Sequence, residues 1–427
     1  IEAMNGGRVQ VLASVADFTN NGQINIGSGS PGDINADSWV NSGSMNVTDG
    51  MLRLRGNFST ADSGLNAGRI TGDATSTLDI RGNVDNAGQT LRTDAFGGRM
   101  VFNGTTVSGG SIETTSAADY QFSASGGNIL DGVSVMGDLD LTSSSATVRM
   151  RNGTAVSGVV NMSSGGRVGL DGTQTTNNVF RQSGAQGSQL TVEGADTSIT
   201  LGAGARGEGR RIDIGSAFAV GGVRTLTNEG GVSANTTDLT GLRFLSLASL
   251  TNSGTFEAVD GGRLSILDSV DEFTNLTGGV LSGGIYRIGA GSRMDLNSDI
   301  TSNSATIEYL GAGAELVGDE NLARNTGTLV IAEDAFVEFL GGLTFETTSV
   351  FQIDVFGAGD SAVVPQVQLM GTAELGGELV LDFTRYSFAG LTMPVEFTFA
   401  SASGFTGAFT SVRIEGIDPI LVETDGQ

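Results

Sequence analysis

Apolar and polar residues alternate in short runs along most of this chain. In Met51-Leu52-Arg53-Leu54-Arg55 and Thr77-Leu78-Asp79-Ile80, for example, the apolar residues are spaced two apart. This spacing predicts β-strands with one buried face. Groups of Gly, Asn, Asp and Ser, which favour tight turns, separate the runs. Residues 1–345 contain no amphipathic helical pattern of useful length, so we predict an all-β fold.

Two distant segments are near-copies of each other. Ile1–Asn20 aligns without a gap on Phe256–Asn275, and 11 of the 20 positions are identical. The alternating stretch Leu250–Leu267 overlaps this unit and contains the turn groups Asn252-Ser253-Gly254 and Asp260-Gly261-Gly262. The chain opens at the position equivalent to Phe256, in the middle of such a unit, so we expect it to be a processed or excised piece. Internal repetition indicates a repeat architecture.

Two kinds of turn recur at variable spacing. Asn-containing turns begin at Asn20, Asn41, Asn86, Asn228 and Asn252. A Gly-Gly-Arg or Gly-Ser-Arg motif followed by an apolar residue ends at Arg8, Arg99, Arg167, Arg263 and Arg293. Equivalent features recur roughly every 18–30 residues, which fits one coil of a β-solenoid better than a propeller blade of about 40. We therefore predict a parallel β-solenoid, in which each coil stacks its strands on the next.

The composition changes near residue 330. Residues 336–409 contain 11 of the 21 Phe, and the apolar runs become longer, as in Val350–Phe356. The open end of a solenoid exposes an unpaired strand row and needs a cap. We predict a solenoid region over residues 1–345 and an aromatic-rich C-terminal β cap over residues 346–427.

Charge and residue usage limit the chemistry. The formal net charge is −25, which disfavours nucleic acid as a partner. All 22 basic residues are Arg, and His, Cys and Lys are absent, which excludes imidazole and thiolate metal sites, Ser-His catalysis, Lys Schiff bases and disulfides. No apolar run approaches the ~20 residues of a membrane span, so we predict no transmembrane segment.

The repeat unit Thr255-Phe256-Glu257-Ala258 with Gly261-Gly262-Arg263 resembles the passenger regions of bacterial autotransporter and haemagglutinin-like surface proteins. The segments Phe351–Val355, Gly371–Leu379 and Gly404–Phe409 are similar to the part that closes many such passengers. The resemblance implies a right-handed, exported β-solenoid at or near a bacterial cell surface. The barrel that autotransporters carry after the passenger is absent from this sequence.

Candidate sites are few, and each has a structural alternative. The arginines of the five Gly-Gly/Ser-Arg motifs would form a basic row for an anionic glycan or a neighbouring subunit. Alternatively, each Gly pair makes a corner and the Arg pairs with nearby acids, which we favour. The segment Gly202–Gly207 has the letters of a dinucleotide-binding loop, but the following residues read as a turn and a strand, where that loop requires a helix.

Carboxylates are the remaining candidates for chemistry. Asp138 and Asp140 are two residues apart and would share one strand face, which is the arrangement that a glycosidase-like pair requires. A solvated acidic face explains them equally well. Calcium, which binds oxygen ligands, stays open; the acidic turn Gly357-Ala358-Gly359-Asp360 occurs once and repeats nowhere.

The sequence therefore predicts a non-enzymatic, extracellular structural or adhesive protein without a required cofactor. Its partners would be extracellular glycans or surfaces, or further copies of itself in a filament or matrix. The alternatives are a polysaccharide-degrading enzyme and a carbohydrate-binding protein on the same β-helical scaffold.

Overall fold

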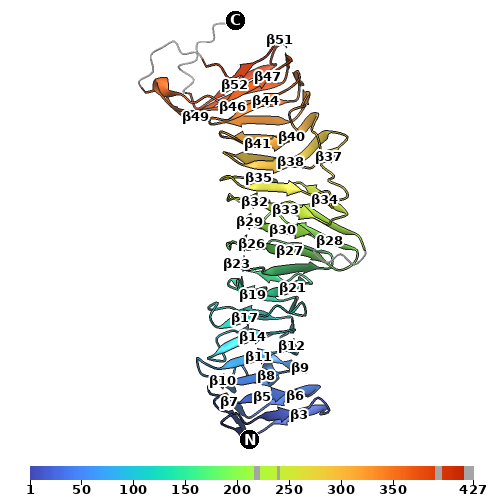
Figure 1. Ribbon diagram of the computed structural model, residues 1–427, viewed down its shortest axis with the longest axis vertical. Coiled ribbons are helices and arrows are strands. Elements are labelled where there is room, and N and C mark those ends of the chain that lie inside the picture. The colour runs from blue at the N-terminus through green and yellow to red at the C-terminus, as the bar shows by residue number, and fades with distance from the viewer. Residues whose placement is uncertain (216–221, 238–240, 390–396, 418–427) are drawn as a thin grey trace. The chain divides into compact units, whose positions relative to one another are not determined.

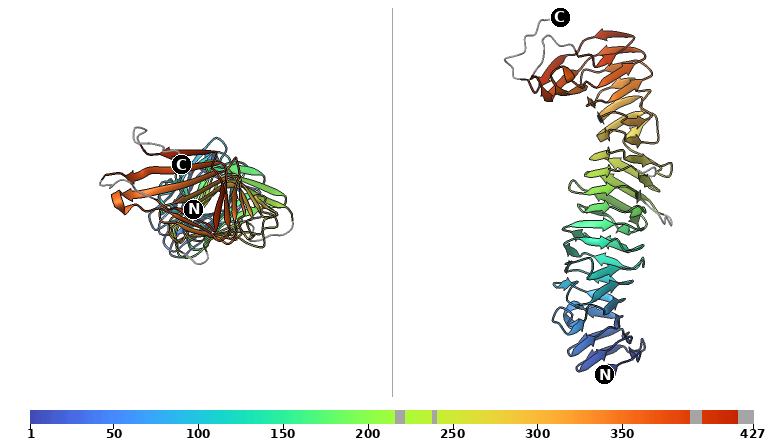
Figure 2. Two further views of the ribbon diagram at one scale, coloured as in Figure 1. Left: turned by 90° about the horizontal axis from the view of Figure 1, so that it is seen from above. Right: turned by 60° about the vertical axis from the view of Figure 1, so that its left-hand side comes forward.

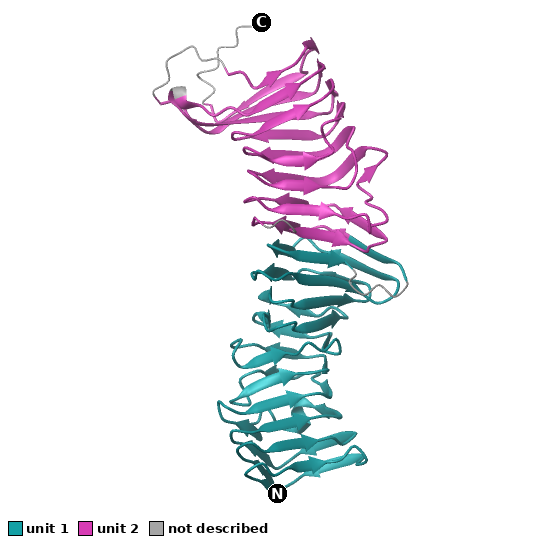
Figure 3. Ribbon diagram, viewed as in Figure 1, with its two compact units in different colours: residues 1–226 teal, residues 227–427 magenta. Residues whose placement is uncertain are grey.

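The computed structural model confirms an all-β fold, a parallel β-solenoid of about 15 turns. It describes residues 1–215, 222–237, 241–389 and 397–417. By their internal contacts the residues form two compact units, unit 1 (Ile1–Leu226) and unit 2 (Thr227–Gln427), coloured in Figure 3. In each unit the strands lie in stacked layers (Figures 1 and 2).

In unit 1 most strands pair in parallel with the third strand after them, so a coil contributes three strands; β10, β17 and β22 are the last strands of their rows. The first two rows of strands are β1 (Glu2–Ala3), β4 (Gln23–Ile26), β7 (Ser44–Val47) and β10 (Ile70–Gly72), and β2 (Val9–Val11), β5 (Pro31–Ile34), β8 (Met51–Leu54), β11 (Thr77–Ile80), β14 (Arg99–Phe102) and β17 (Tyr120–Phe122). The third row is β3 (Asp17–Asn20), β6 (Ser38–Asn41), β9 (Asn57–Ser59), β12 (Asn83–Asp85), β15 (Thr106–Ser108), β18 (Ile129–Asp131), β21 (Thr147–Arg151), β24 (Arg167–Asp171), β27 (Ser188–Glu193) and β30 (Ile212–Gly215).

Three shorter rows complete unit 1. They are β13 (Thr90–Arg92), β16 (Ser111–Glu113), β19 (Ser134–Met136) and β22 (Ala155–Val156); β20 (Leu139–Leu141), β23 (Val159–Met162), β26 (Val179–Gln182) and β29 (Arg206–Gly209); and β25 (Gln174–Thr176) with β28 (Thr197–Leu201). Strand β31 (Arg224–Asn228) crosses the boundary between the units. One short helix, α1 (Thr60–Ser63), is capped by the Ser59 hydroxyl, which accepts from the Asp62 N–H.

Unit 2 keeps the parallel stacking, but some of its strands pair with the second strand after them, as β38 does with β40 and β39 with β41. Its strands are β32 (Gly231–Ala234), β33 (Leu242–Leu245), β34 (Ser249–Asn252), β35 (Thr255–Ala258), β36 (Arg263–Ile266), β37 (Leu276–Thr277), β38 (Val280–Gly289), β39 (Arg293–Asp295), β40 (Ser302–Leu310), β41 (Glu315–Val317), β42 (Arg324–Asn325), β43 (Thr328–Ala332), β44 (Phe336–Phe339), β45 (Leu343–Phe345), β46 (Val350–Ala358), β47 (Gln366–Leu369), β48 (Thr372–Leu375), β49 (Glu378–Ser387), β50 (Ala400–Ser401), β51 (Gly404–Gly407) and β52 (Ser411–Glu415). A 3₁₀ turn, η1, covers Gly359–Ser361. The antiparallel pairing of β37 with β38 is a local hairpin.

The aromatic-rich segment after residue 345 continues this stacking. β43 pairs with β46, β46 with β49, and β49 with β52, all in parallel. The predicted boundary at residues 345–346 is thus a change of composition across which strand pairing continues. The segment Glu423–Gln427, as well as Val395 and Glu396, lies outside the described residues.

The core of each coil is a stack of inward side chains in register. Along β5, β8, β11 and β14, Ile34, Leu54, Ile80 and Phe102 follow one another at successive levels, and each is at most 1% exposed. Burying such a side chain stabilises the fold by about 1.5–3 kcal/mol. The alternation seen in the sequence is the inward and outward alternation of these strands.

The recurrent Asn turns are buried amide ladders. Asn41 is fully buried; its Oδ1 accepts from Asn20 Nδ2 at 2.8 Å, and its own Nδ2 donates to the Ser63 carbonyl at 3.1 Å. In unit 2, Asn228 Nδ2 donates to Asn252 Oδ1 at 2.8 Å. Asn20, Asn41 and Asn228 also donate to backbone carbonyl groups at a corner, where strand pairing is interrupted.

The repeat unit recognised in the sequence is one structural motif. In both copies a strand (β1 or β35) ends in a turn whose first residue, Asn5 or Asp260, has φ 53°. The next residue, Gly6 or Gly261, has φ 82° or 75°. This left-handed conformation favours glycine, which explains why the Gly is kept in both copies.

Candidate functional site

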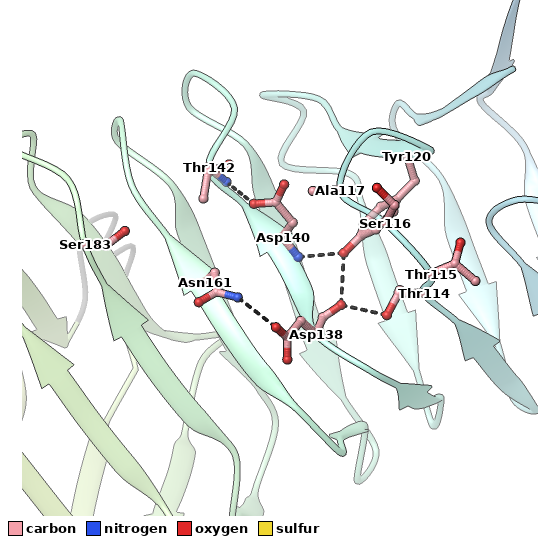
Figure 4. A pocket seen from close by; sticks show the side chains of 10 residues that line it. All are labelled: Thr114, Thr115, Ser116, Ala117, Tyr120, Asp138, Asp140, Thr142, Asn161 and Ser183. Atoms are coloured by element: carbon pink, nitrogen blue, oxygen red, sulfur yellow. Dashed lines mark hydrogen bonds between the residues drawn. The ribbon is translucent and has the colours of Figure 1, made fainter. Parts of the chain in front are cut away.

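A hollow lies on the surface of unit 1 beside β20 and β23 (Figure 4). It encloses about 430 Å³ and is open to solvent. Most of its lining residues carry polar side chains; they are Thr114, Thr115, Ser116, Ala117, Tyr120, Asp138, Asp140, Thr142, Asn161 and Ser183. We call it the β20 groove. It contains both members of the carboxylate pair singled out in the sequence.

Tyr120 forms the buried base of the β20 groove. It is 2% exposed, and its hydroxyl donates to the Asp138 carbonyl at 3.0 Å while accepting from the Asp140 N–H at 2.7 Å. Burial raises the pKa of Tyr120 well above its ordinary value of 10.0. The side chain is therefore a neutral phenol that ties β17 to β20.

The two carboxylates point in different directions (Figure 4). Asp138 turns toward β23, where its Oδ1 accepts from the Val159 N–H at 2.8 Å and its Oδ2 from Asn161 Nδ2 at 3.4 Å. Asp140 turns the other way, and its Oδ1 accepts from the Thr142 N–H at 2.9 Å. Both acids lie in the groove, as their spacing predicts, but each one satisfies a backbone N–H at a strand end.

The rim of the β20 groove offers hydrogen-bonding groups to solvent. Thr115, Ser116, Thr142 and Ser183 are exposed, as is the Asp138 side chain. For a ligand rich in hydroxyl groups, such as a sugar, this rim provides both hydrogen-bond donors and hydrogen-bond acceptors. The arrangement is suited to binding a polyhydroxyl compound at a solvent-exposed site.

The five Gly-Gly/Ser-Arg motifs are corners. Their first glycines, Gly6, Gly97, Gly165, Gly261 and Gly291, all have φ between 63° and 85°. Arg8 pairs with Asp33 at 3.4 Å, Arg167 donates to Gln189 Oε1 at 2.7 Å, and Arg293 pairs with Glu315. Arg8 and Arg99 belong to the row that contains β2 and β14, whereas Arg167, Arg263 and Arg293 belong to the row that contains β24, β36 and β39, so the five arginines form no single basic row.

Residues 202–205 of the segment Gly202–Gly207 connect β28 to β29, and its last two residues begin β29. The strand that follows it agrees with the sequence-based expectation and excludes the strand-to-helix setting of a dinucleotide-binding loop. Among the described residues, no three Asp or Glu gather as a metal-binding group would require, and none of the described helices is long and apolar enough to cross a membrane.

Sequence reasoning missed a buried acid–phenol pair in unit 2. The hydroxyl of Tyr309 donates to Oδ2 of Asp319, and the two residues are 1% and 8% exposed. Burial, together with the smaller effects of the Glu320 and Glu315 carboxylates, raises the pKa of Asp319 to about 7 against the opposing hydrogen bond from Tyr309. Ten residues separate the pair, so only the coil geometry brings them together.

A second hollow, of about 270 Å³, lies in unit 2 near its C-terminal end. Its walls are apolar and include Phe345, Phe351, Phe399, Phe405 and Phe409. The rings of Phe345 and Phe351 are 4.8 Å apart between centroids, so this part of the aromatic-rich segment forms a mutual aromatic cluster. Six of the 11 Phe of residues 336–409 line this hollow.

No protein-family model, curated protein or solved structure matches this chain in the comparisons.

Proposed function

We propose that this chain is an extracellular structural or adhesive protein of a cell surface, which acts through an extended binding surface. The observation that carries the proposal is the in-register stacking of outward polar side chains. Parallel coils repeat their outward positions about every 4.8 Å, so that a long ligand meets an equivalent contact at each level.

One such row borders the β20 groove. Asp140 on β20 is aligned with Asn161 on β23, Arg181 on β26 and Glu208 on β29. Arg181 and Glu208 pair at 2.6 Å. A row of this kind supports many weak, additive contacts, which is how an adhesive surface gains strength from multivalency.

A second candidate function is carbohydrate binding in the β20 groove itself. The exposed hydroxyls of Thr115, Ser116, Thr142 and Ser183 favour it, because sugars are recognised through such groups. In a polysaccharide-degrading enzyme, Asp138 and Asp140 would have to exchange their N–H partners for a substrate. Only the enzyme would cleave a glycan; a carbohydrate-binding protein would bind it and leave it intact.

The test uses the purified chain coupled to beads. We expect the beads to adhere to cells or matrix, and we expect neutral and acidic glycans incubated with the chain to remain uncleaved, with or without calcium. Turnover that disappears in Asp138→Asn or Asp140→Asn, and persists in the exposed control Asp271→Asn, would overturn the proposal. Saturable binding of a neutral oligosaccharide that Asp138→Asn alone weakens would establish the carbohydrate-binding alternative.

A further inference from the structure

Four arginines and two aspartates form one connected ion-pair network on the outward side of β2, β5, β8 and β11. Asp33 is paired with Arg8 at 3.4 Å, Arg55 at 3.2 Å and Arg53 at 3.6 Å. Asp79 is paired with Arg53 at 3.1 Å and Arg81 at 2.8 Å. We call Arg8, Arg53, Arg55 and Arg81 with these two acids the arginine face. Its net charge is +2, on a chain whose net charge is −25.

The guanidinium groups of this face are exposed to solvent, whereas its carboxylates are almost completely buried. The side chains of Asp33 and Asp79 are only 7% and 5% exposed. Those of Arg8, Arg55 and Arg81 are 51%, 32% and 34% exposed. The acids therefore lie beneath the arginines and hold them in place, and the accessible surface is positive.

The arrangement follows from the register of the strands. Asp33, Arg53 and Asp79 are directly aligned on β5, β8 and β11. Arg55 and Arg81 follow these strands by one residue and flank the aligned acids on one side. Because an arginine fork has five N–H donors and each of these pairs uses one or two of them, donors remain for a further anion.

The opposite side of the face is acidic. Asp49 and Asp73 lie in the turns that precede β8 and β11, and the Asp73 carboxylate is held by the hydroxyls of Thr75 and Ser76. These hydrogen bonds lower the pKa of Asp73 to about 2, so it is an anion. An anionic ligand is thus directed toward the Arg55–Arg81 side and along the stacking direction of the strands.

We propose that the arginine face binds a linear uronate polysaccharide, whose carboxylates pair with successive guanidinium groups. The proposal rests on the adhesive function proposed above and names a ligand class for it. Arg55 and Arg81 follow the neighbouring strands β8 and β11, which are about 4.8 Å apart, so a polymer with regularly spaced carboxylates meets a cation at each of these two levels. Bidentate pairing with arginine recognises a planar carboxylate.

A polyuronate fits this face better than a nucleic acid. Duplex DNA carries about one charge per 1.7 Å of its axis, and its repulsion from the acidic remainder of the chain is correspondingly large. A polymer with one carboxylate per sugar concentrates less charge. At an ionic strength of about 0.1 M, charges more than roughly 10 Å away are screened, so the local positive face decides the interaction.

The test compares two triple variants of the whole chain in the binding of fluorescent polygalacturonate. We expect Arg8→Gln/Arg55→Gln/Arg81→Gln to weaken binding about tenfold or more, because three exposed charge contacts are lost. The matched control replaces by Gln three arginines of unit 2 that each pair with a glutamate: Arg293, Arg324 and Arg413. It should bind within about twofold of the wild type, since both triples change the net charge equally.

Three further arms keep the result decisive. The charge-preserving Arg55→Lys/Arg81→Lys variant should retain salt-sensitive binding, and fully methyl-esterified polygalacturonate should not bind. Absence of wild-type binding, equal losses in both triples, or tighter binding of duplex DNA at the same salt concentration would each overturn the proposal. Bead adhesion that persists without polygalacturonate binding would refute this ligand class and leave the adhesive function standing.

Discussion

Replacing Asp319 by Asn removes an ionisable group that unit 2 buries against the Tyr309 hydroxyl. The pKa of this carboxyl is about 7 in the folded protein and 3.8 when exposed, as in an unfolded chain. Between these values the folded state holds the proton more tightly, so the group's contribution to stability is fully present below about pH 4 and is lost as the pH rises through about 7.

The size of the effect follows from this interval. At about 1.36 kcal/mol per pH unit, ionising Asp319 in place costs up to about 4 kcal/mol of stability above pH 7. An Asn amide keeps an acceptor for the Tyr309 hydroxyl and never ionises. We therefore expect Asp319→Asn to match the wild type near pH 4 and to exceed it in stability near pH 8.

The assay is amide hydrogen exchange of peptides covering β40, β41 and β43, which reports the local opening free energy. Comparing both proteins at the same pH cancels the intrinsic pH dependence of exchange. At pH 8 the variant should exchange up to about a thousandfold more slowly, since each tenfold corresponds to about 1.4 kcal/mol. The exposed Glu338→Gln in β44 serves as the matched control and should leave the exchange unchanged. If the ratio of the exchange rates of the variant and the wild type stays constant from pH 4 to 8, the reasoning is refuted.

Two further substitutions test the corners. Gly254→Ala would place the new methyl group 2.2 Å from the Gly230 carbonyl oxygen, so we expect a lowered denaturation midpoint. The methyl group of Gly231→Ala would have no neighbouring atom within 4 Å, so this substitution should be tolerated. Asn41→Ala removes a buried amide that bonds to the coils on either side and should cost about 1–3 kcal/mol in chemical denaturation, while Asn57→Ala, at an exposed position, should change stability by less than about 0.5 kcal/mol. Equal effects within either pair would contradict the assignment of these positions.

The sequence was sufficient to predict the fold because its signals are local. The runs read as strands in Met51–Leu54 and Thr77–Ile80 are β8 and β11. Alternation fixes which side chains turn inward, and Gly or Asn marks where the chain reverses. Both signals lie within a few residues of each other, so they can be read without knowing which coil stacks on which.

The arginine face was not predictable in the same way. Asp33 and Arg53 are separated by 20 residues and Arg53 and Asp79 by 26, because the corners between them differ in length. A register error of one residue turns every outward side chain inward, so alignment across coils of unequal length requires the structure.

The Asp138–Asp140 pair shows a related limit. Their spacing correctly predicts a shared region of the surface. Asp138, however, lies just before β20 and so follows no strand alternation, and its carboxylate is drawn to the N–H of Val159 on the next coil. Sequence spacing defines a shared face only inside a strand.

The pairing of most strands of unit 1 with the third strand after them also bears on how such a chain changes in evolution. A coil in unit 1 hydrogen-bonds only to the coil before and the coil after it, through backbone groups that any sequence supplies. Gain or loss of a whole coil by duplication or deletion leaves every remaining pair intact, whereas loss of a single strand shifts all three rows. The inheritable unit is therefore a complete three-strand coil, and outward residues such as those of the arginine face are free to diverge from coil to coil.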